Sequence, residues 1–236
     1  MISARRGLLI GNSRWHWADP VPQGWQFRHT LPQPSQLGSS PVVWAAVGQV
    51  PDQGQLDPEQ RVVLSDVPLP GCPPWLGVDR ALGAWAAWRI SQQMALDLSG
   101  GLLLVDAGTV LSQTLLTQQG AFQGGQLMPG LRLQLKAMNF ATQALPIPTG
   151  MEALPSLFPQ STCDAMVRGA IQAMVTTVVE SIRRTGACAW ICGGDAEVLA
   201  DQIDRTGEGV QIRMDRDLVM KGLVDLIRPI RSDRDH

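Results

Sequence analysis

The stretch Leu102 to Thr109 has the sequence Leu-Leu-Leu-Val-Asp-Ala-Gly-Thr, an aliphatic run that stops at an acid, a glycine and a hydroxyl. A continuous apolar run of this length is typical of a strand covered on both faces. Val110 to Thr117 has the character of a second strand, so Gly108 and Thr109 are predicted to form a hairpin turn. Burying a carboxylate alone is costly. We therefore expect Asp106 to serve a cation or phosphate site rather than to be a structural turn residue.

The same plan occurs roughly 100 residues earlier in the chain. Leu8-Leu9-Ile10 is an apolar run that ends at Gly11-Asn12-Ser13, and Arg14 to Ala18 then alternates as a strand does. Glycine lets a backbone approach a ligand closely, and the neighbouring hydroxyl and amide groups suit phosphate oxygens. Taken alone, each turn is more typical of an ordinary hairpin turn, and only the repetition brings the phosphate interpretation level with it. The repetition suggests a duplicated fold whose two turns face each other across a cleft and grip a phosphate chain.

Periodicity and turn chemistry predict the remaining elements. Apolar runs indicate strands at residues 42–47, 61–64, 121–128, 187–192 and 210–214. Three- and four-residue spacing indicates helices at 81–98, 129–138, 163–184, 196–203 and 218–227. Residues 20–41 are rich in Pro, Gln, Ser and Gly, which predicts a connection. Strands alternating with helices indicate an α/β protein with an N-terminal domain at 1–99 and a C-terminal domain at 100–236.

Composition limits the possible classes of protein. The 236 residues are 44% hydrophobic and 17% charged, which is enough apolar material for a core. The net charge of -2 argues against a nucleic-acid binder, which needs a basic face. The spacing of the four cysteines matches no zinc motif, so buried reduced thiols are expected. No apolar run reaches the roughly 18 residues of a membrane span, and the run after the basic N-terminus is too short for a signal peptide. A cytoplasmic protein without membrane contact is expected.

Gly77-Val78-Asp79-Arg80 precedes a predicted helix and has two interpretations. Asp79 could cap the free N–H groups of that helix. In a substrate site, Arg80 could instead hold a carboxylate in a bidentate fork while Asp79 takes a proton from a hydroxyl. Gly193-Gly194-Asp195 lies between a buried strand and a helix start, where an anion would be favoured. His16 is interpreted as an ordinary strand residue rather than a ligand or base.

Taken in order along the chain, these segments resemble the motifs of the type III pantothenate kinase family. The segments that carry the resemblance are Ile10-Gly11-Asn12-Ser13-Arg14, Gly77-Val78-Asp79-Arg80, Val105-Asp106-Ala107-Gly108-Thr109, Gly124 to Gly130, Ser161-Thr162 with Gly169, Gly193-Gly194-Asp195-Ala196 and Leu218 to Leu223. Any one of them is a weak match, but seven in the family order, spread over nearly the whole chain, form a specific pattern.

The resemblance implies duplicated actin-like, sugar-kinase-like (ribonuclease H-like) domains with an interdomain cleft. It implies ATP-dependent phosphorylation of pantothenate to 4'-phosphopantothenate, the first step of coenzyme A biosynthesis. Asp79 would be the catalytic proton acceptor, and Asp106 would ligate a monovalent cation, potassium or ammonium. Magnesium would accompany ATP. The residues expected to bind pantothenate are Gly77, Val78, Asp79, Arg80 and Thr162, the last across a homodimer interface. The residues expected to contact ATP are Ile10, Gly11, Asn12, Ser13, Gly108 and Thr109.

Two departures from the family pattern keep rival functions open. The first motif of the family has an acid two residues before its glycine, where this chain has Leu9. That loss favours a non-catalytic or regulatory relative that binds nucleotide or pantothenate without phosphorylating it. The family also has a tyrosine upstream of the substrate motif, and this chain contains no tyrosine. That absence favours a kinase for a different small hydroxylated acid.

Overall fold

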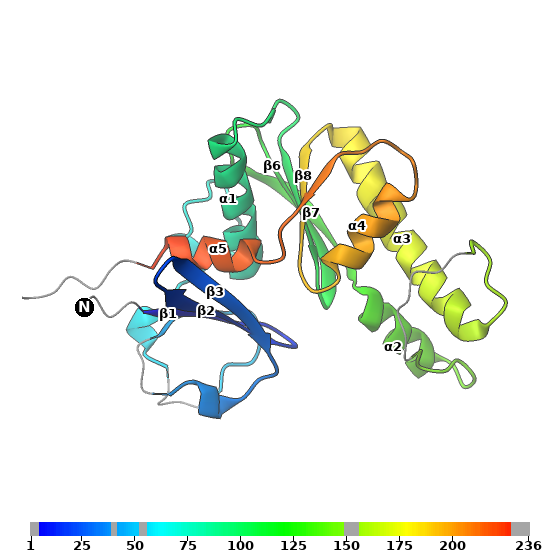
Figure 1. The fold of residues 1–236 in the computed structure, drawn as a ribbon, viewed down its shortest axis with the longest axis horizontal. Coiled ribbons are helices and arrows are strands. Elements are labelled where there is room, and N and C mark those ends of the chain that lie inside the picture. The colour runs from blue at the N-terminus through cyan, green and yellow to red at the C-terminus, as the bar shows by residue number, and fades with distance from the viewer. Residues whose placement is uncertain (1–4, 39–41, 52–55, 149–155, 228–236) are drawn as a thin grey trace, which may run out of the picture. The chain divides into compact units, whose positions relative to one another are not determined.

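The computed structural model describes residues 5–38, 42–51, 56–148 and 156–227, which form two compact units (Figure 1). Unit 1 contains the chain up to Ile90 together with the residues from Asp217 onward, and unit 2 runs from Ser91 to Arg216. This division differs at the C-terminus from the expected one at 1–99 and 100–236. The last helix packs on strands of unit 1 although it follows unit 2 in the chain.

Unit 1 is built on a four-stranded sheet in the order β3-β2-β1-β4. Its strands are β1 (Arg6–Ile10), β2 (Trp15–Val21), β3 (Gly24–Thr30) and β4 (Val42–Ala46). The strands β1, β2 and β3 form an antiparallel meander, and β4 runs parallel to β1. A short 3-10 turn at Pro34–Gln36 lies between β3 and β4, and two more follow β4 at Pro58–Gln60 and Leu64–Asp66.

The two faces of this sheet are covered differently. Alternate residues of β1 and β2 point into one core, whose members are Leu8, Ile10, Trp15, Trp17, Leu37, Val42 and Trp44. The helices of unit 1 are α1 (Val78–Gln93) and α5 (Leu218–Asp225). Leu223 of α5 lies close to Gly7 on the second face, and a side chain on Gly222 would collide with the Leu82 carbonyl group of α1. The two helices therefore pack closely enough that only glycine fits at position 222.

Unit 2 is built on a five-stranded sheet in the order β7-β6-β5-β8-β9. Its strands are β5 (Leu102–Ala107), β6 (Val110–Leu116), β7 (Phe122–Pro129), β8 (Cys188–Cys192) and β9 (Ile212–Met214). The strands β5, β6 and β7 again form an antiparallel meander, and β8 runs parallel to β5. The helices are α2 (Leu131–Ala141), α3 (Thr162–Thr185) and α4 (Ala196–Asp204).

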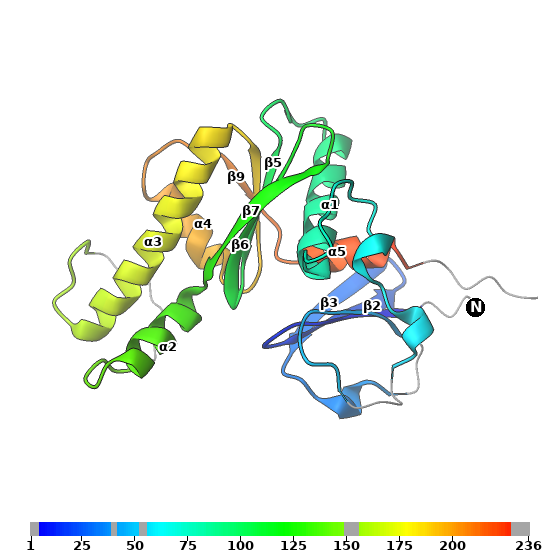
Figure 2. The ribbon, with the colours of Figure 1, turned by 180° about the vertical axis from the view of Figure 1, so that it is seen from behind.

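One face of this sheet carries the core of unit 2. Leu103, Val105 and Ala107 of β5 belong to the same buried cluster as residues of α2, α3 and α4. Figure 2 shows the ribbons of α3 and α4 beside this sheet. The α3 helix contributes an apolar stripe: Met166, Val167, Ala170, Ile171, Met174, Val175, Val178, Val179 and Ile182. Ser161 caps its start by accepting from the Asp164 N–H, and Gly186 ends it in the left-handed region at φ 64°. This helix was predicted with its stripe and with both ends.

The two sheets repeat one topology, as the two predicted hairpins suggested. In each, a three-stranded meander is followed by a strand that pairs in parallel with the first. Ile10 pairs with Trp15 and Ala107 pairs with Leu111, and each pair is the last before its turn. Leu9 and Asp106 therefore occupy the same place in the repeat, one residue before the end of the first strand.

Several element predictions need correction. The expected connection at 20–41 contains the end of β2 and all of β3. Pro20 is tolerated in β2 because pairing with β1 ends at Ala18, so no bond to β1 needs its missing N–H. The strand expected at 61–64 is only an isolated bridge at Arg61, since the Asp66 carboxylate accepts from the Val63 N–H and closes a local turn. Pro129 ends β7 instead of opening a helix.

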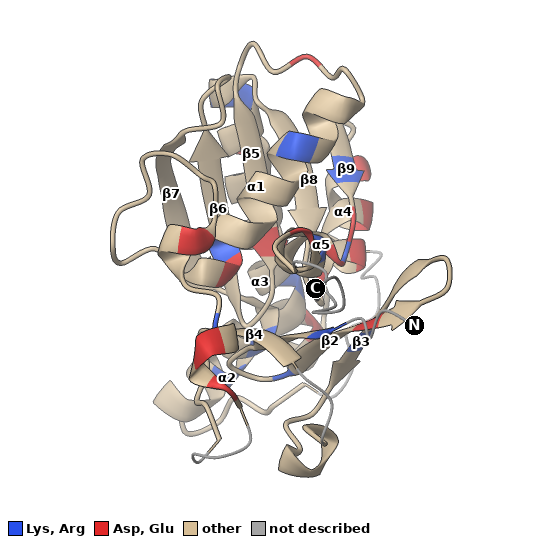
Figure 3. Ribbon diagram, turned by 90° about the vertical axis from the view of Figure 1, so that its left-hand side faces the viewer, with Lys and Arg blue, Asp and Glu red and all other residues tan. Residues whose placement is uncertain are grey.

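The structure also shows where charged residues lie, whether a described helix could cross a membrane, and the state of the cysteines. Acidic and basic residues occur in both units (Figure 3). Among the helices that the structure describes, none combines the length and apolarity that crossing a membrane requires. Cys72, Cys163, Cys188 and Cys192 are all free thiols.

Candidate active site

The first predicted phosphate turn joins β1 to β2 in unit 1. Ile10 is the buried last residue of β1, and the Gly11 N–H donates to the Arg14 carbonyl oxygen at 3.0 Å. Asn12 and Ser13 are exposed at the tip of the turn. The tight backbone bond fixes the turn, while the exposed amide and hydroxyl groups supply donors of the kind that bind phosphate oxygens.

Gly48 holds the backbone of this turn in place. The N–H groups of Val47 and Gly48 both donate to the Ile10 carbonyl oxygen, at 2.9 and 3.0 Å. A Cβ on Gly48 would collide with the carbonyl group of Gly11. Only glycine therefore allows the end of β4 to lie against the turn. Sequence reasoning missed Gly48, which is a single glycine after an apolar run with no motif around it.

The substrate motif lies beside the same feature. A Cβ on Gly77 would be 3.7 Å from Val47, so the motif approaches the end of β4. Val78 is the buried first residue of α1, and Arg80 is only 8% exposed. Unit 1 thus brings the first turn and the Gly77 to Arg80 motif together around residues 47 and 48.

Asp79 is a half-buried carboxylate in the first turn of α1. Its Oδ1 atom accepts from the Arg80 N–H at 2.7 Å, which is the local bond expected of a helix-start aspartate. Burial nevertheless raises the pKa of Asp79 above its ordinary value, and the Arg80 N–H and guanidinium only partly oppose this. A carboxylate with a raised pKa is a better proton acceptor than a solvated one. Capping and general-base chemistry are therefore compatible in this residue.

The second predicted turn joins β5 to β6 in unit 2. The Gly108 N–H donates to the Val110 carbonyl oxygen at 3.3 Å, and the Gly130 N–H donates to the Thr109 carbonyl oxygen at 3.0 Å. Thr109 is exposed and Asp106 is half-buried at the end of β5. The turn is therefore anchored by the start of α2 as well as by its own hairpin.

Gly193 plays the part in unit 2 that Gly48 plays in unit 1. It follows β8, the strand parallel to β5, and a Cβ there would collide with the Asp106 carboxylate and the Ala107 backbone. The Asp195 N–H donates to the Ala107 carbonyl oxygen at 2.9 Å. Burial raises the pKa of the Asp195 carboxyl, and Arg132 partly opposes the shift. The Gly193 to Asp195 motif thus lies directly behind the second turn.

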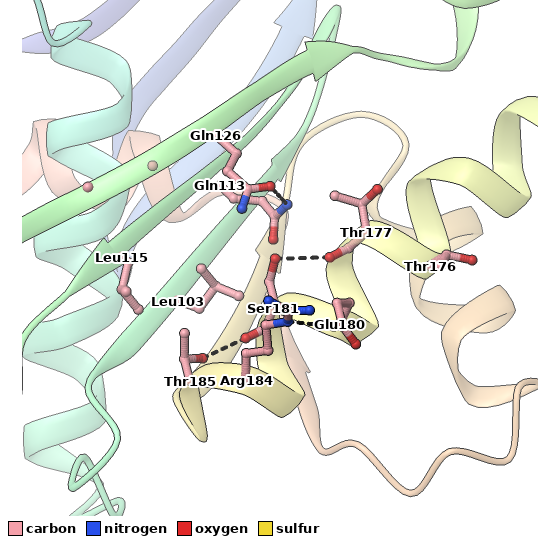
Figure 4. Close-up of a pocket in the computed structure, with 12 residues that line it drawn as sticks. Leu103, Gln113, Leu115, Gln126, Thr176, Thr177, Glu180, Ser181, Arg184 and Thr185 are labelled. Carbon is pink, nitrogen blue, oxygen red and sulfur yellow. Dashed lines mark hydrogen bonds and ion pairs between the residues drawn. The ribbon is translucent and has the colours of Figure 1, made fainter.

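The other features bear less directly on this site. Thr162, the first residue of α3, is exposed, and no described contact links it to either turn. A groove of about 520 Å³ lies in unit 2 between the β5 to β7 strands and α3, and none of the predicted site residues lines it (Figure 4).

The side chains around the two turns suit phosphate-bound magnesium better than a metal ion held by the protein alone. Within the described ranges, no group of three or more His, Cys, Asp or Glu side chains could hold a metal ion. Each turn is instead packed at close range by a glycine, Gly48 behind the first turn and Gly193 behind the second. Turns that supply donors but few carboxylates fit a phosphate chain that brings its own magnesium, because magnesium is held largely by substrate phosphates and water. Asp106 adds one carboxylate beside the second turn.

Comparison with known proteins identifies the family. A family model of type III pantothenate kinases matches residues 72–184. A type III pantothenate kinase from Synechococcus elongatus is 30% identical over an alignment 264 positions long, which covers 98% of this chain and 100% of the relative. This chain belongs to the type III pantothenate kinase family. The family-model match includes Asp79, the second turn and Thr162, and the longer alignment extends over nearly the whole chain.

Solved structures with the same fold were also found for this member of the type III pantothenate kinase family. A putative Baf family transcriptional activator from Campylobacter jejuni has a TM-score of 0.61 at 18% identity, covering 94% of this chain and 96% of that one. A putative 2-dehydro-3-deoxygalactonokinase from Sinorhizobium meliloti has a TM-score of 0.57 at 12% identity, covering 94% and 97%. The predicted α/β fold with duplicated, actin-like and sugar-kinase-like domains is confirmed.

Proposed function

We propose that this protein transfers the γ-phosphoryl group of ATP to the hydroxyl group of pantothenate, giving 4'-phosphopantothenate in the first step of coenzyme A biosynthesis. Family membership supports the reaction. The observation that carries the proposal for this particular chain is Asp79, a desolvated carboxylate beside the end of β4, against which the first turn also packs.

The proposed chemistry is mostly positioning and charge stabilisation. In phosphoryl transfer the protein need not form a covalent bond to the phosphoryl group. Asp79 accepts the proton of the pantothenate hydroxyl, and Arg80 pairs with the carboxylate at the other end of pantothenate. The turns at Gly11 and Gly108 bind phosphate oxygens through backbone and side-chain donors. Magnesium, when bound, neutralises charge on the phosphates.

A monovalent cation, potassium or ammonium, is proposed at Asp106. The supporting observation is the position of this residue, where a carboxylate lies one residue before the end of the otherwise aliphatic strand β5 and against Gly193. Carbonyl and phosphate oxygens would complete the coordination. The free state of all four cysteines agrees with a reducing compartment, and we propose the cytoplasm.

A symmetric homodimer is proposed, with Thr162 of each chain near the pantothenate site of the other. Two large apolar side chains support it, because Phe140 of α2 is 93% exposed and Phe158, just before α3, is 85% exposed. Exposed apolar side chains of this size mark contact surfaces when they cluster. Phe140 lies in α2, and Phe158 lies in the segment that leads into α3, which begins at Thr162.

One assay tests the reaction. Purified protein, pantothenate and magnesium-ATP are incubated in potassium, ammonium or sodium-only buffer, and phosphopantothenate is quantified by mass spectrometry. Product is expected in potassium or ammonium, with much less in sodium. If calorimetry detects pantothenate binding but no product forms at saturating ATP, magnesium and potassium, the protein is a binding relative and the kinase proposal is wrong. Turnover of another small hydroxy acid in place of pantothenate would correct the substrate instead.

A further inference from the structure

A chain of hydrogen bonds runs through unit 1 and uses both histidines of the β2–β3 hairpin. His16 and His29 are directly opposite in the register of these strands, and their Nδ1 atoms are 2.7 Å apart. Nε2 of His29 lies 3.0 Å from Oδ1 of Asp217, the residue before α5. The two rings meet edge to face at 68°, with centroids 4.9 Å apart. The order is therefore Asp217, His29, His16.

The free end of this chain reaches the first phosphate turn. His16 is paired with Leu9, so its side chain lies on the same face of the sheet as Leu9 and Gly11. An ideal Cβ on Gly11 would be 3.2 Å from Nε2 of His16, so the imidazole edge touches the turn. Among the described residues this nitrogen has no hydrogen-bond partner in the protein. It is available to whatever the turn binds.

The order of partners determines which nitrogen carries each proton. An ionised carboxylate only accepts, so His29 donates from Nε2 to Asp217 and, when neutral, accepts at Nδ1. His16 must then donate from Nδ1 to His29, which leaves a lone pair on its Nε2. Burial lowers the pKa of His16 to about 4, and His29 and Arg14 act in the same direction, so His16 is neutral near pH 7.

One added proton turns Nε2 of His16, the last atom of this hydrogen-bond chain, from an acceptor into a donor. A solvent proton that binds Nε2 of His16 turns this nitrogen into a donor. The proton already on Nδ1 of His16 can then pass to Nδ1 of His29 across the short bond between them. The positive charge moves from the desolvated His16 ring to His29, beside the Asp217 carboxylate, where it is stabilised. No other bond breaks, and the only reactant is the solvent proton.

We propose that Asp217, His29 and His16 form a proton relay behind the first phosphate turn, which takes up a proton when nucleotide phosphates bind there and presents His16 Nε2–H as a donor to them. His16 and its two supports are thus positioning residues for the nucleotide. The inference rests on the proposed binding of ATP phosphates at this turn. It gives the turn a switchable N–H donor beside Leu9, while the added charge is held at His29 next to Asp217.

The charged groups around His16 favour this coupling. Arg14 of the turn opposes protonation of His16 in the free protein, while Asp217 at the start of α5 favours it. A bound triphosphate would offset Arg14 and would meet an unfavourable lone pair on Nε2 unless a proton is added. Leu9, the cross-strand neighbour, carries no charge that could substitute. Nucleotide and proton therefore bind cooperatively.

Calorimetry tests the relay. Binding of ADP with magnesium is measured near pH 7 in buffers of different ionisation enthalpy, which reports the protons taken up. On binding nucleotide, the wild-type protein is expected to bind more protons than the His16→Gln variant, by as much as one proton. Ionisation of the nucleotide itself contributes equally to both measurements. The Kd of the wild-type protein should rise by at most about tenfold per pH unit above pH 7. The change Arg28→Gln on the opposite face of β3 is the matched control and should keep the uptake. Equal uptake in the wild type and His16→Gln overturns the relay.

A second measurement needs no variant. The chain has three histidines, so 15N-labelled imidazoles give a spectrum in which each ring can be assigned. In the free protein at pH 7 we expect Nε2 of His16 to have the shift of an unprotonated nitrogen, and saturating nucleotide should convert it to a protonated one. An unprotonated Nε2 with nucleotide bound overturns the relay alone. No binding of nucleotide at all overturns the function on which it rests.

Discussion

Asp79 shows how one residue can satisfy a structural rule and a chemical one. Its bond to the Arg80 N–H is an ordinary local bond at a helix start, and sequence reasoning left capping and catalysis as alternatives. The structure adds burial, which raises the pKa. Because the folded pKa lies above the unfolded one, the contribution of Asp79 to stability is largest below the unfolded pKa. It is lost as pH rises through the folded pKa.

The change Asp79→Asn therefore should affect activity and stability in opposite directions. We expect turnover to fall at least ~100-fold, the scale of a lost general base. The thermal midpoint at pH 8 should stay the same or rise, because the amide does not pay the desolvation penalty of a carboxylate. Turnover assays and scanning fluorimetry measure the two effects. Asp204→Asn, which changes an exposed carboxylate of α4, is the control and should change neither. Near-normal turnover in Asp79→Asn would remove it from the mechanism.

Leu9 is the second residue whose substitution separates the alternatives. It is 5% exposed and lies between Ala45 and His16 in the sheet. We expect Leu9→Asp to lower the apparent constant for magnesium-ATP, since it restores an acid at the repeat position of Asp106. The thermal midpoint should fall because the carboxylate is buried. Leu9→Asn should lose stability without the kinetic gain. A magnesium-ATP constant that rises equally in both variants would show that position 9 has no part in metal organisation.

At the scale of elements, the glycines after β4 and β8 are equivalent features that sequence reasoning treated unequally. Gly193 belongs to a motif between a predicted strand and a helix, so it was recognised. Gly48 stands alone, and the need for glycine there arises from contact with Gly11, which is remote in sequence. Contacts of this kind are set by tertiary packing, which local pattern does not contain. The same limit explains why β3 was missed: the register of β2 decides whether Pro20 is allowed.

Gly48→Ala tests whether the close packing of Gly48 against the Gly11 carbonyl group matters for nucleotide binding. A methyl group there must displace the Gly11 carbonyl group, so the turn should shift and nucleotide affinity should fall by about tenfold or more, since misplaced groups lose much of their binding energy. Calorimetric titration with ADP gives the affinity. Gly169→Ala in α3 is matched in chemistry, but its Cβ would meet nothing within 4 Å, so it should bind nucleotide normally. Unchanged affinity in Gly48→Ala would exclude the first turn from the nucleotide site.

At the scale of the whole molecule, the duplicated hairpin was the most informative sequence feature. It predicted two copies of one topology, and the sheet orders β3-β2-β1-β4 and β7-β6-β5-β8 have this relation. The position of α5 could not be predicted in the same way, because chain order places it after unit 2 while its apolar residues pack in unit 1. The His16 relay was also missed, since it depends on a hairpin register and on this return of the chain. A binding site formed jointly by the two turns stays a prediction.

The homodimer is a prediction at this scale, and it can be tested by breaking it. Phe140 and Phe158 are almost fully exposed, which costs free energy in an isolated chain and would be offset by a contact with a second copy. We expect a dimer by light scattering at micromolar concentration, and a shift to monomer in the double variant Phe140→Ser with Phe158→Ser. Leu31→Ser, which changes a 65% exposed residue in unit 1, is the control.

The same experiment connects assembly to substrate binding. If Thr162 serves the partner's pantothenate site, the monomeric double variant and Thr162→Val in the intact dimer should both raise KM for pantothenate while leaving nucleotide affinity unchanged. The two changes would disrupt the same pantothenate site, so their effects on KM should not be additive. Combining Thr162→Val with the double variant should therefore raise KM little further. A wild-type monomer would contradict the dimer. A dimer that persists in the double variant, with normal KM, would move the interface away from α2 and the start of α3.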